Sequence, residues 1–250
     1  MMPVDSPRAQ DGEFEGEIPV RIPLTLLLTL RDLDTPEDPR ELEEMSLSLN
    51  LRRRLGLSSV VLKQIRRYEE SGGDVRAAEV ASLFELVAKR IDAPEIFAST
   101  GRRITHDAFG PGVRLMLRFG WRLVPSRLRP ILAWGRVRKI ARRLSPASKI
   151  RTDKGLNGIV MERGLPVLST ADSGGRGCEI MSGIIDESFR TYRAGEGEIS
   201  HPHCEASGGE HCLWVVEPTP SANVEPAPSA NPKEENLAAN DPTADDSTAD

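Results

Sequence analysis

The chain has 250 residues, a net charge of −5 and three cysteines. This length allows one or two domains with a core large enough to fold without disulfides, and so few cysteines argue against a disulfide scaffold. The longest largely apolar run, residues 22–30, is too short to span a bilayer. The acidic N-terminal segment lacks the features of a signal peptide, so we expect a cytoplasmic protein with reduced thiols.

Charge is distributed unevenly along the chain. Residues 217–250 carry eight acidic side chains and one lysine, whereas residues 102–151 carry fourteen arginines or lysines and one acid, Asp107. Residues 218–250 are also rich in proline and alanine, so we expect them to form a disordered acidic tail. Residues 1–19 are polar and aperiodic, and we expect a loose N-terminal arm there.

Residues 20–149 are expected to form a mainly helical region with one strand at its start. Apolar side chains occupy alternate positions over residues 21–30, from Ile22 to Leu30, and this period of two predicts a strand. Pro23 favours an edge position for that strand, because proline has no N–H to donate to a neighbouring strand.

Three helices are predicted after this strand from their start signals and apolar spacing. Ser58 precedes the first, and the Gly72–Gly73 pair ends it. Asp74 is the predicted cap of the second, whose apolar stripe extends to Ile91, and Asp92 opens the third. No set of base-reading side chains lies on one face of these helices, so nucleic acid is not an expected partner.

Residues 109–144 form a basic amphipathic segment. Its arginines include Arg114, Arg118 and Arg122, four apart on one helical face, and Trp134 lies further along. Such a segment is typical of helices that lie on an anionic membrane surface or an acidic partner. The simpler interpretation is a packed helix pair whose arginines are solvated or neutralised by acids elsewhere in the chain.

From about residue 150 the pattern changes to short apolar segments separated by glycines, which predicts strands and turns. A helix with one wide apolar face is expected over residues 178–192. A strand that ends near Cys204, a turn at Gly208–Gly209 and a strand over residues 212–216 follow. The order of elements is therefore helices, strands, helix and hairpin.

Residues 201–212, HPHCEASGGEHC, contain three of the four histidines and two of the three cysteines. Cys204 and Cys212 flank a glycine turn, and His201 lies three positions before Cys204. Thiolate and imidazole are the usual ligands of structural zinc, and turns commonly hold them close together. Cys178, at the start of the preceding helix, is the candidate fourth ligand.

His203 is an alternate to His201, because Pro202 interrupts the alternation of the strand. Two buried free cysteines, or a disulfide between the two cysteines of the hairpin, are the alternatives without a metal. A catalytic site would need an open coordination position and a general base, for which Glu205 and Glu210 are candidates. Four candidate protein ligands favour a closed structural site.

These residues resemble the four-vinyl-reductase domain, a family found in bacteriochlorophyll-biosynthesis proteins and as the sensor domain of aromatic-responsive bacterial transcription activators. The resemblance covers about residues 150–217 and rests on Cys178, Gly183, His201, Cys204, Gly208, Cys212 and Trp214. It implies zinc binding at the matching positions, with His201 where sensor-type members have an acid. It also implies that any output passes through a protein partner.

The fold that the resemblance implies is α+β, with an N-terminal helical region followed by helices packed on an antiparallel sheet with a C-terminal zinc hairpin. An apolar ligand pocket would lie above the hairpin. Its candidate lining residues, which are equally consistent with plain core, are Met181, Ile184, Ile185 and Trp214.

We therefore expect a non-enzymatic sensor or accessory domain, stabilised by zinc, that binds a small apolar or aromatic molecule. An enzymatic role, as a tetrapyrrole vinyl-group reductase component or a zinc hydrolase, is the first alternative. The second is an adaptor that docks on a membrane or an acidic partner through its basic helices. The sequence leaves open whether the chain forms a homodimer.

Overall fold

The computed structural model describes residues 16–35, 55–109, 124–145, 148–153, 157–162, 174–195 and 197–218. Most of the predicted arm, the arginines at 114–122 and the tail from residue 219 onward lie outside these ranges. Within the described part of the chain, no helix combines the length and the apolar character needed to cross a membrane.

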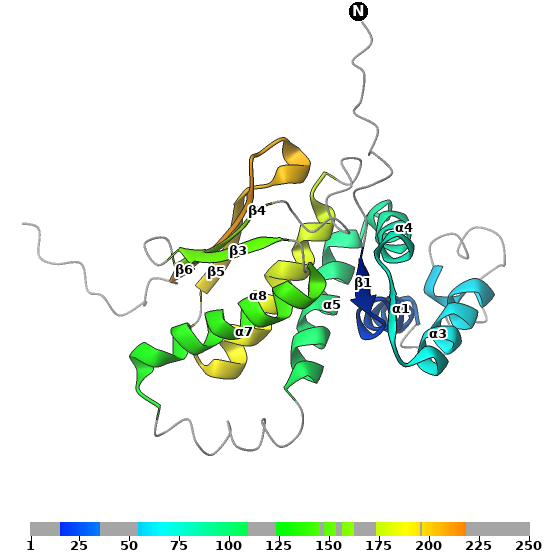
Figure 1. Cartoon of the computed structure of the whole chain (residues 1–250), viewed down its shortest axis with the longest axis horizontal. Coiled ribbons are helices and arrows are strands. Elements are labelled where there is room, and N and C mark those ends of the chain that lie inside the picture. The colour runs from blue at the N-terminus through cyan, green and yellow to red at the C-terminus, as the bar shows by residue number, and fades with distance from the viewer. Residues whose placement is uncertain are drawn as a thin grey trace, which may run out of the picture. The chain divides into compact units, whose positions relative to one another are not determined.

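The described residues form an α+β fold with six α-helices and two antiparallel sheets (Figure 1). The helices are α1 (Arg21–Asp34), α3 (Ser59–Ser71), α4 (Ala77–Ala88), α5 (Ala93–Ala108), α7 (Arg129–Leu144) and α8 (Glu179–Tyr192). Short 3-10 turns are η1 (Leu55–Leu57), η3 (Ser126–Leu128), η5 (Arg176–Cys178) and η6 (Glu205–Ser207).

The smaller sheet pairs β1 (Glu17–Pro19) with β2 (Asp74–Arg76). The larger sheet has the order β3 (Lys149–Asp153), β4 (Gly158–Glu162), β6 (Cys212–Pro218) and β5 (Gly197–His203). β5 and β6 form the C-terminal hairpin, and their register shifts between Ser200 and His203. Pro202 lies at this irregularity and cannot donate a backbone hydrogen bond, which explains why regular pairing stops there.

Helix α8 is the centre of the core and packs against both α5 and α7, while α7 and α8 also contact the larger sheet (Figure 1). Two glycines allow α5 and α8 to approach closely. A Cβ at Gly183 of α8 would overlap the backbone oxygen of Ala98, and a Cβ at Gly101 of α5 would overlap that of Ile180. The contact between these helices therefore requires the absence of a side chain at both positions.

The segment 21–30, predicted to be an edge strand, is instead the first part of helix α1. Leucine fills five of the seven positions from 24 to 30, so the run fits both a period of two and the helical period. The strand prediction was wrong because leucine favours helices and Pro23 lies in the first turn of α1. The backbone N–H groups of a first turn make no hydrogen bond within the helix, so proline loses none there.

Three further sequence expectations are corrected by the structure around the small sheet and α4. Residues 17–19 form strand β1 instead of part of a loose arm. Asp74 begins strand β2 and does not cap a helix, since α4 begins after Arg76. Ile91 lies beyond α4 and is 98% exposed, so it is not part of the apolar stripe. A three-residue strand is too short to leave a readable pattern, which is why the helix start was misplaced.

The ends of α3 and the start of α5 confirm the other predicted signals. The Ser58 hydroxyl accepts a hydrogen bond from the backbone N–H of Val61 at 3.3 Å, and Gly72 ends α3 with a left-handed φ of 60°. Asp92 precedes the first residue of α5. Local signals therefore located both ends of α3 and the start of α5, although Asp92 makes no side-chain capping bond.

A buried carboxylate links α1 to the segment before α5. Asp34 is 5% exposed and accepts two hydrogen bonds from the Arg90 guanidinium, at 2.7 and 2.8 Å, and one from the backbone N–H of Gly56 at 2.7 Å. Removal of the Asp34 carboxylate takes one of two carboxylate partners from the largely buried Arg90, which still pairs with Asp92 at 2.6 Å, and takes the acceptor of the Gly56 N–H. We expect Asp34→Ala to lower the free energy of unfolding by about 3 kcal/mol, measured by urea denaturation.

Asp32 on the same helix provides the control for this substitution. Its carboxylate also pairs with an arginine, Arg103, at 2.6 Å, but half of its side chain is exposed. A solvated pair contributes little, so Asp32→Ala should change the stability by less than about 1 kcal/mol. Equal effects of the two substitutions would show that the buried pair does not hold α1 in place.

Candidate metal centre

Four side chains meet beside the turn that connects the two strands of the hairpin. Cys178 is the last residue of η5, immediately before α8, and His201 lies on β5. Cys204 directly follows β5, and Cys212 is the first residue of β6. The site therefore joins the N-terminal end of α8 to both strands of the hairpin.

Gly175 permits the close approach of the η5 turn to the hairpin. Its φ is 79°, a left-handed conformation that favours glycine, and a Cβ at this position would lie 2.8 Å from Cys204 Sγ. A side chain here would push the turn, and with it Cys178, away from the other cysteines. The glycine-rich lead into the helix thus has a packing role at the site.

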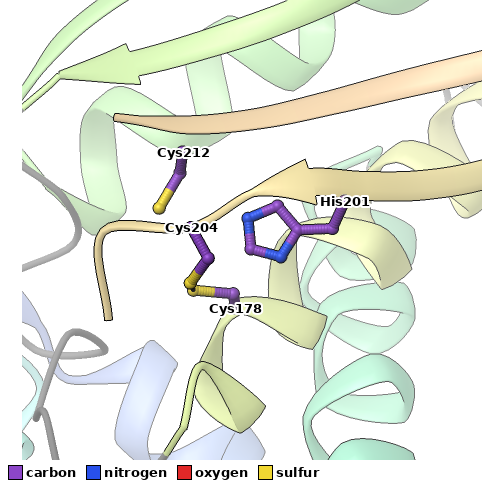
Figure 2. A group of neighbouring side chains, drawn as sticks. All are labelled: Cys178, His201, Cys204 and Cys212. Atoms are coloured by element: carbon purple, nitrogen blue, oxygen red, sulfur yellow. Dashed lines mark hydrogen bonds between the residues drawn. The ribbon is translucent and has the colours of Figure 1, made fainter. Parts of the chain in front are cut away.

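The four candidate ligand atoms all lie within 4.8 Å of one another. Figure 2 shows the three cysteine side chains and the His201 imidazole pointing toward a common point. The Sγ atoms of Cys178 and Cys204 are 3.7 Å apart, and all three thiols are free. Tetrahedral zinc with bonds of about 2.3 Å would separate two sulfurs by about 3.8 Å, so this spacing fits a shared ion.

The His201 imidazole is held in place by its neighbour on the adjacent strand. Its ring stacks on Trp214 with centroids 4.4 Å apart and 3° between the ring planes. Its Nε2 atom is buried and has no hydrogen-bond partner among the described residues. A buried ring nitrogen without a partner costs free energy, and a metal ion at the common point would satisfy it.

The cysteines of the cluster shift the pKa values of one another. A hydrogen bond with Cys178 is the largest cause that lowers the pKa of Cys212 to about 4, and His201 and the backbone N–H of Glu205 lower it further. The same pairing, together with burial, raises the pKa of Cys178. The Glu205 N–H donates to Cys212 Sγ at 3.4 Å. The environment therefore supports a thiolate at Cys212, the form in which cysteine binds metals.

The other polar residues of the hairpin lie outside this cluster. His203, the alternate ligand, is exposed, and its ring lies 5.7 Å from that of His211. Glu205 contributes its backbone N–H to the site, and Glu210 is exposed. The four atoms that come together are those of Cys178, His201, Cys204 and Cys212.

The four residues predicted to line a ligand pocket are buried in the core. Met181, Ile184 and Ile185 are fully buried on α8, and Trp214 is 1% exposed on β6. Their role as pocket lining stays a prediction.

A surface groove of about 480 Å³ lies at the opposite end of α8 from the metal centre. It is lined by Asp186, Phe189, Arg190, Arg193, Gly195, Gly197, Ile199 and Val216. Sequence patterns do not predict this groove, because it forms where the end of a helix packs against the strand hairpin that follows it.

The comparisons with known proteins provide no relative for this chain. No family model, no curated protein and no solved structure matches it. The resemblance to the four-vinyl-reductase domain therefore stays a prediction that rests on the residues of the hairpin and α8.

Proposed function

We propose that this chain is a zinc-stabilised domain that binds a small apolar or aromatic molecule and works as a sensor or an accessory protein. The observation that carries the zinc assignment is the convergence of three thiols and one buried, unpaired imidazole nitrogen on one point. Three sulfurs and one imidazole are a common ligand set of structural zinc, and soft thiolates select against magnesium and calcium.

A structural role fits the coordination better than a catalytic one. Four protein ligands complete a tetrahedral shell and leave no position for water or substrate. Cys178 and Cys212 are also buried, which limits access to the ion. The zinc would tie α8 to the hairpin, whose strands have seven residues each. The enzymatic alternative, a zinc hydrolase, would need one of these ligands to leave.

The groove at the far end of α8 is the proposed ligand site. Its lining includes apolar side chains, Phe189, Ile199 and Val216, and the exposed guanidinium of Arg193. The lining carboxylate of Asp186 already pairs with Arg102 at 3.6 Å. Such a surface suits a small aromatic ring that carries an anionic group, because the ring leaves water and the anion meets the guanidinium. The resemblance to the sensor domains of aromatic-responsive activators also points to an aromatic ligand, although not to its anionic group.

A thermal-shift screen with small aromatic carboxylates, beginning with benzoate and naphthoate, tests this proposal. Binding to the folded state alone stabilises it by about 2.7 kcal/mol at a ligand concentration of 100 times Kd. We expect a rise in Tm of about 5 °C or more at saturation. Arg193→Glu should abolish the rise, whereas Arg66→Glu on the remote helix α3 should leave it unchanged. Failure of every such compound to raise the Tm would remove this ligand assignment.

A further inference from the structure

Helix α7 has one face in the core and one face in solvent. The buried face consists of Ala133, Trp134, Val137, Ile140, Ala141 and Leu144. Trp134, which the amphipathic pattern offers as a membrane contact, is thus part of the core, and its indole N–H donates to the Asn157 side chain at 3.0 Å. The remaining side of the helix is exposed and has an unusual composition.

The exposed face of α7 and the turn before it divides into two halves. The N-terminal half consists of large aliphatic side chains that are 45 to 65% exposed, Leu128, Ile131 and Leu132. The C-terminal half consists of exposed bases, Arg138, Lys139, Arg142 and Arg143. At 100° per residue these seven positions fall within one side of the helix. We call them the α7 face.

The charge on the α7 face is uncompensated within the described structure. Residues 124–145 contain no acidic side chain. Ion pairs between described residues include Arg102 with Asp186 and Arg151 with Glu162, yet none involves a base of the α7 face. Four cations in one strip repel one another unless an anionic surface lies opposite them, so the strip suits a partner that is densely anionic.

We propose that the α7 face docks the protein on an anionic lipid surface, with the helix axis parallel to the membrane plane. The four bases would lie at the level of the lipid headgroups, each gaining from the negative surface potential. The three aliphatic side chains would enter the boundary between headgroups and acyl chains. Removing their apolar surface from water would stabilise the bound state. A nucleic-acid backbone would satisfy the bases but leave the aliphatic side chains in water.

The rigid packing of α7 favours this contact. Interfacial helices that are disordered in water must order when they bind, and that ordering weakens their affinity. Here the buried face already fixes the helix against α8 and β3. The free protein therefore already holds the bases and the aliphatic side chains in the arrangement that a membrane would contact.

Flotation of the zinc-loaded 250-residue chain with lipid vesicles tests the proposal. The vesicles contain phosphatidylcholine and phosphatidylserine in equal parts, and pure phosphatidylcholine serves as the neutral surface. We expect binding to the mixed vesicles, weaker binding as salt is raised, and little binding to the neutral ones. The charge variant Arg138→Glu/Arg142→Glu and the apolar variant Ile131→Ser/Leu132→Ser should each lower the partition coefficient by about tenfold or more.

Helix α3 provides matched controls, because it also has exposed bases and exposed aliphatic side chains. Lys63→Glu/Arg66→Glu changes the net charge equally, and Val60→Ser/Leu62→Ser removes exposed apolar groups of similar size. Both should stay within about twofold of the unmodified chain, since the contact is specific to α7. An unchanged Tm verifies that each variant is folded.

Three results would overturn the proposal. The first is no flotation with the anionic vesicles. The second is an equal loss of binding in the α3 and α7 variants, which would mean attraction by overall charge alone. The third is retention on duplex DNA together with no binding to the vesicles, which would reassign the face to nucleic acid.

Discussion

Replacing His201 with alanine is expected to lower the free energy of unfolding by about 3 kcal/mol and to weaken zinc binding strongly. The imidazole is the one nitrogen ligand of the proposed site, and its Nε2 atom is buried without another partner. Its removal opens the coordination shell and detaches β5 from the ion. Urea denaturation of the zinc-loaded protein measures the loss, and a fall in Tm of about 10 °C should accompany it.

His203→Ala is the matched control for this substitution. This second histidine lies two positions further along β5, is exposed and lies outside the cluster. Its removal should change the stability by less than about 0.5 kcal/mol.

A chelator separates loss of the metal from loss of the ring stack on Trp214. Zinc removal should lower the free energy of unfolding of the unmodified chain more than that of the His201→Ala variant, because the variant binds zinc weakly and gains less stability from it. Equal effects of chelator on both proteins would mean that His201 stabilises the hairpin by packing alone.

Gly183→Ala should destabilise the fold by at least about 3 kcal/mol, because the new Cβ meets backbone and not a movable side chain. The atom in its way is the carbonyl oxygen of Ala98, which belongs to the hydrogen-bonded backbone of α5. To make room, α5 and α8 must move apart along the largest helix contact of the core. Thermal and urea unfolding both measure this loss.

Gly135→Ala makes the same chemical change at a position with free space. This glycine is exposed on α7, and a Cβ there would meet no atom within 4 Å. Alanine restricts the unfolded chain and favours the helix, so the substitution should stabilise the protein by about 0.5–1 kcal/mol. Opposite signs for the two substitutions are the signature of close helix packing at Gly183, and a neutral Gly183→Ala would contradict it.

The cluster of the metal centre was predictable because the types of its side chains, thiol and imidazole, indicate metal binding. Cysteine and histidine concentrated around a glycine turn leave few roles other than metal binding in a reduced protein. The turn itself brings Cys204 near Cys212, and the helix that begins after Cys178 has a clear apolar face. The choice between His201 and His203 was not predictable, because a register shift at Pro202 decides which side chain faces inward.

Helix α1 and the groove were not predicted from the sequence, for different reasons. In α1 the leucines are so dense that the two periodicities cannot be distinguished, and tertiary burial of Leu26, Leu27 and Leu30 decides for the helix. The groove depends on how the end of α8 packs beside β5 and β6, which local pattern does not encode. Capping signals, by contrast, depend on one or two neighbouring residues and were read correctly at Ser58 and Gly72.

Elemental analysis of the purified 250-residue chain is the sharpest test of the proposed zinc site. We expect one zinc ion per chain and protection of all three thiols from a thiol reagent. Replacing any one of Cys178, Cys204 and Cys212 with serine should release the zinc and expose the two remaining thiols to the reagent. A protein that contains no metal even after incubation with zinc, and whose three thiols react freely, would show that the four side chains do not form a zinc site.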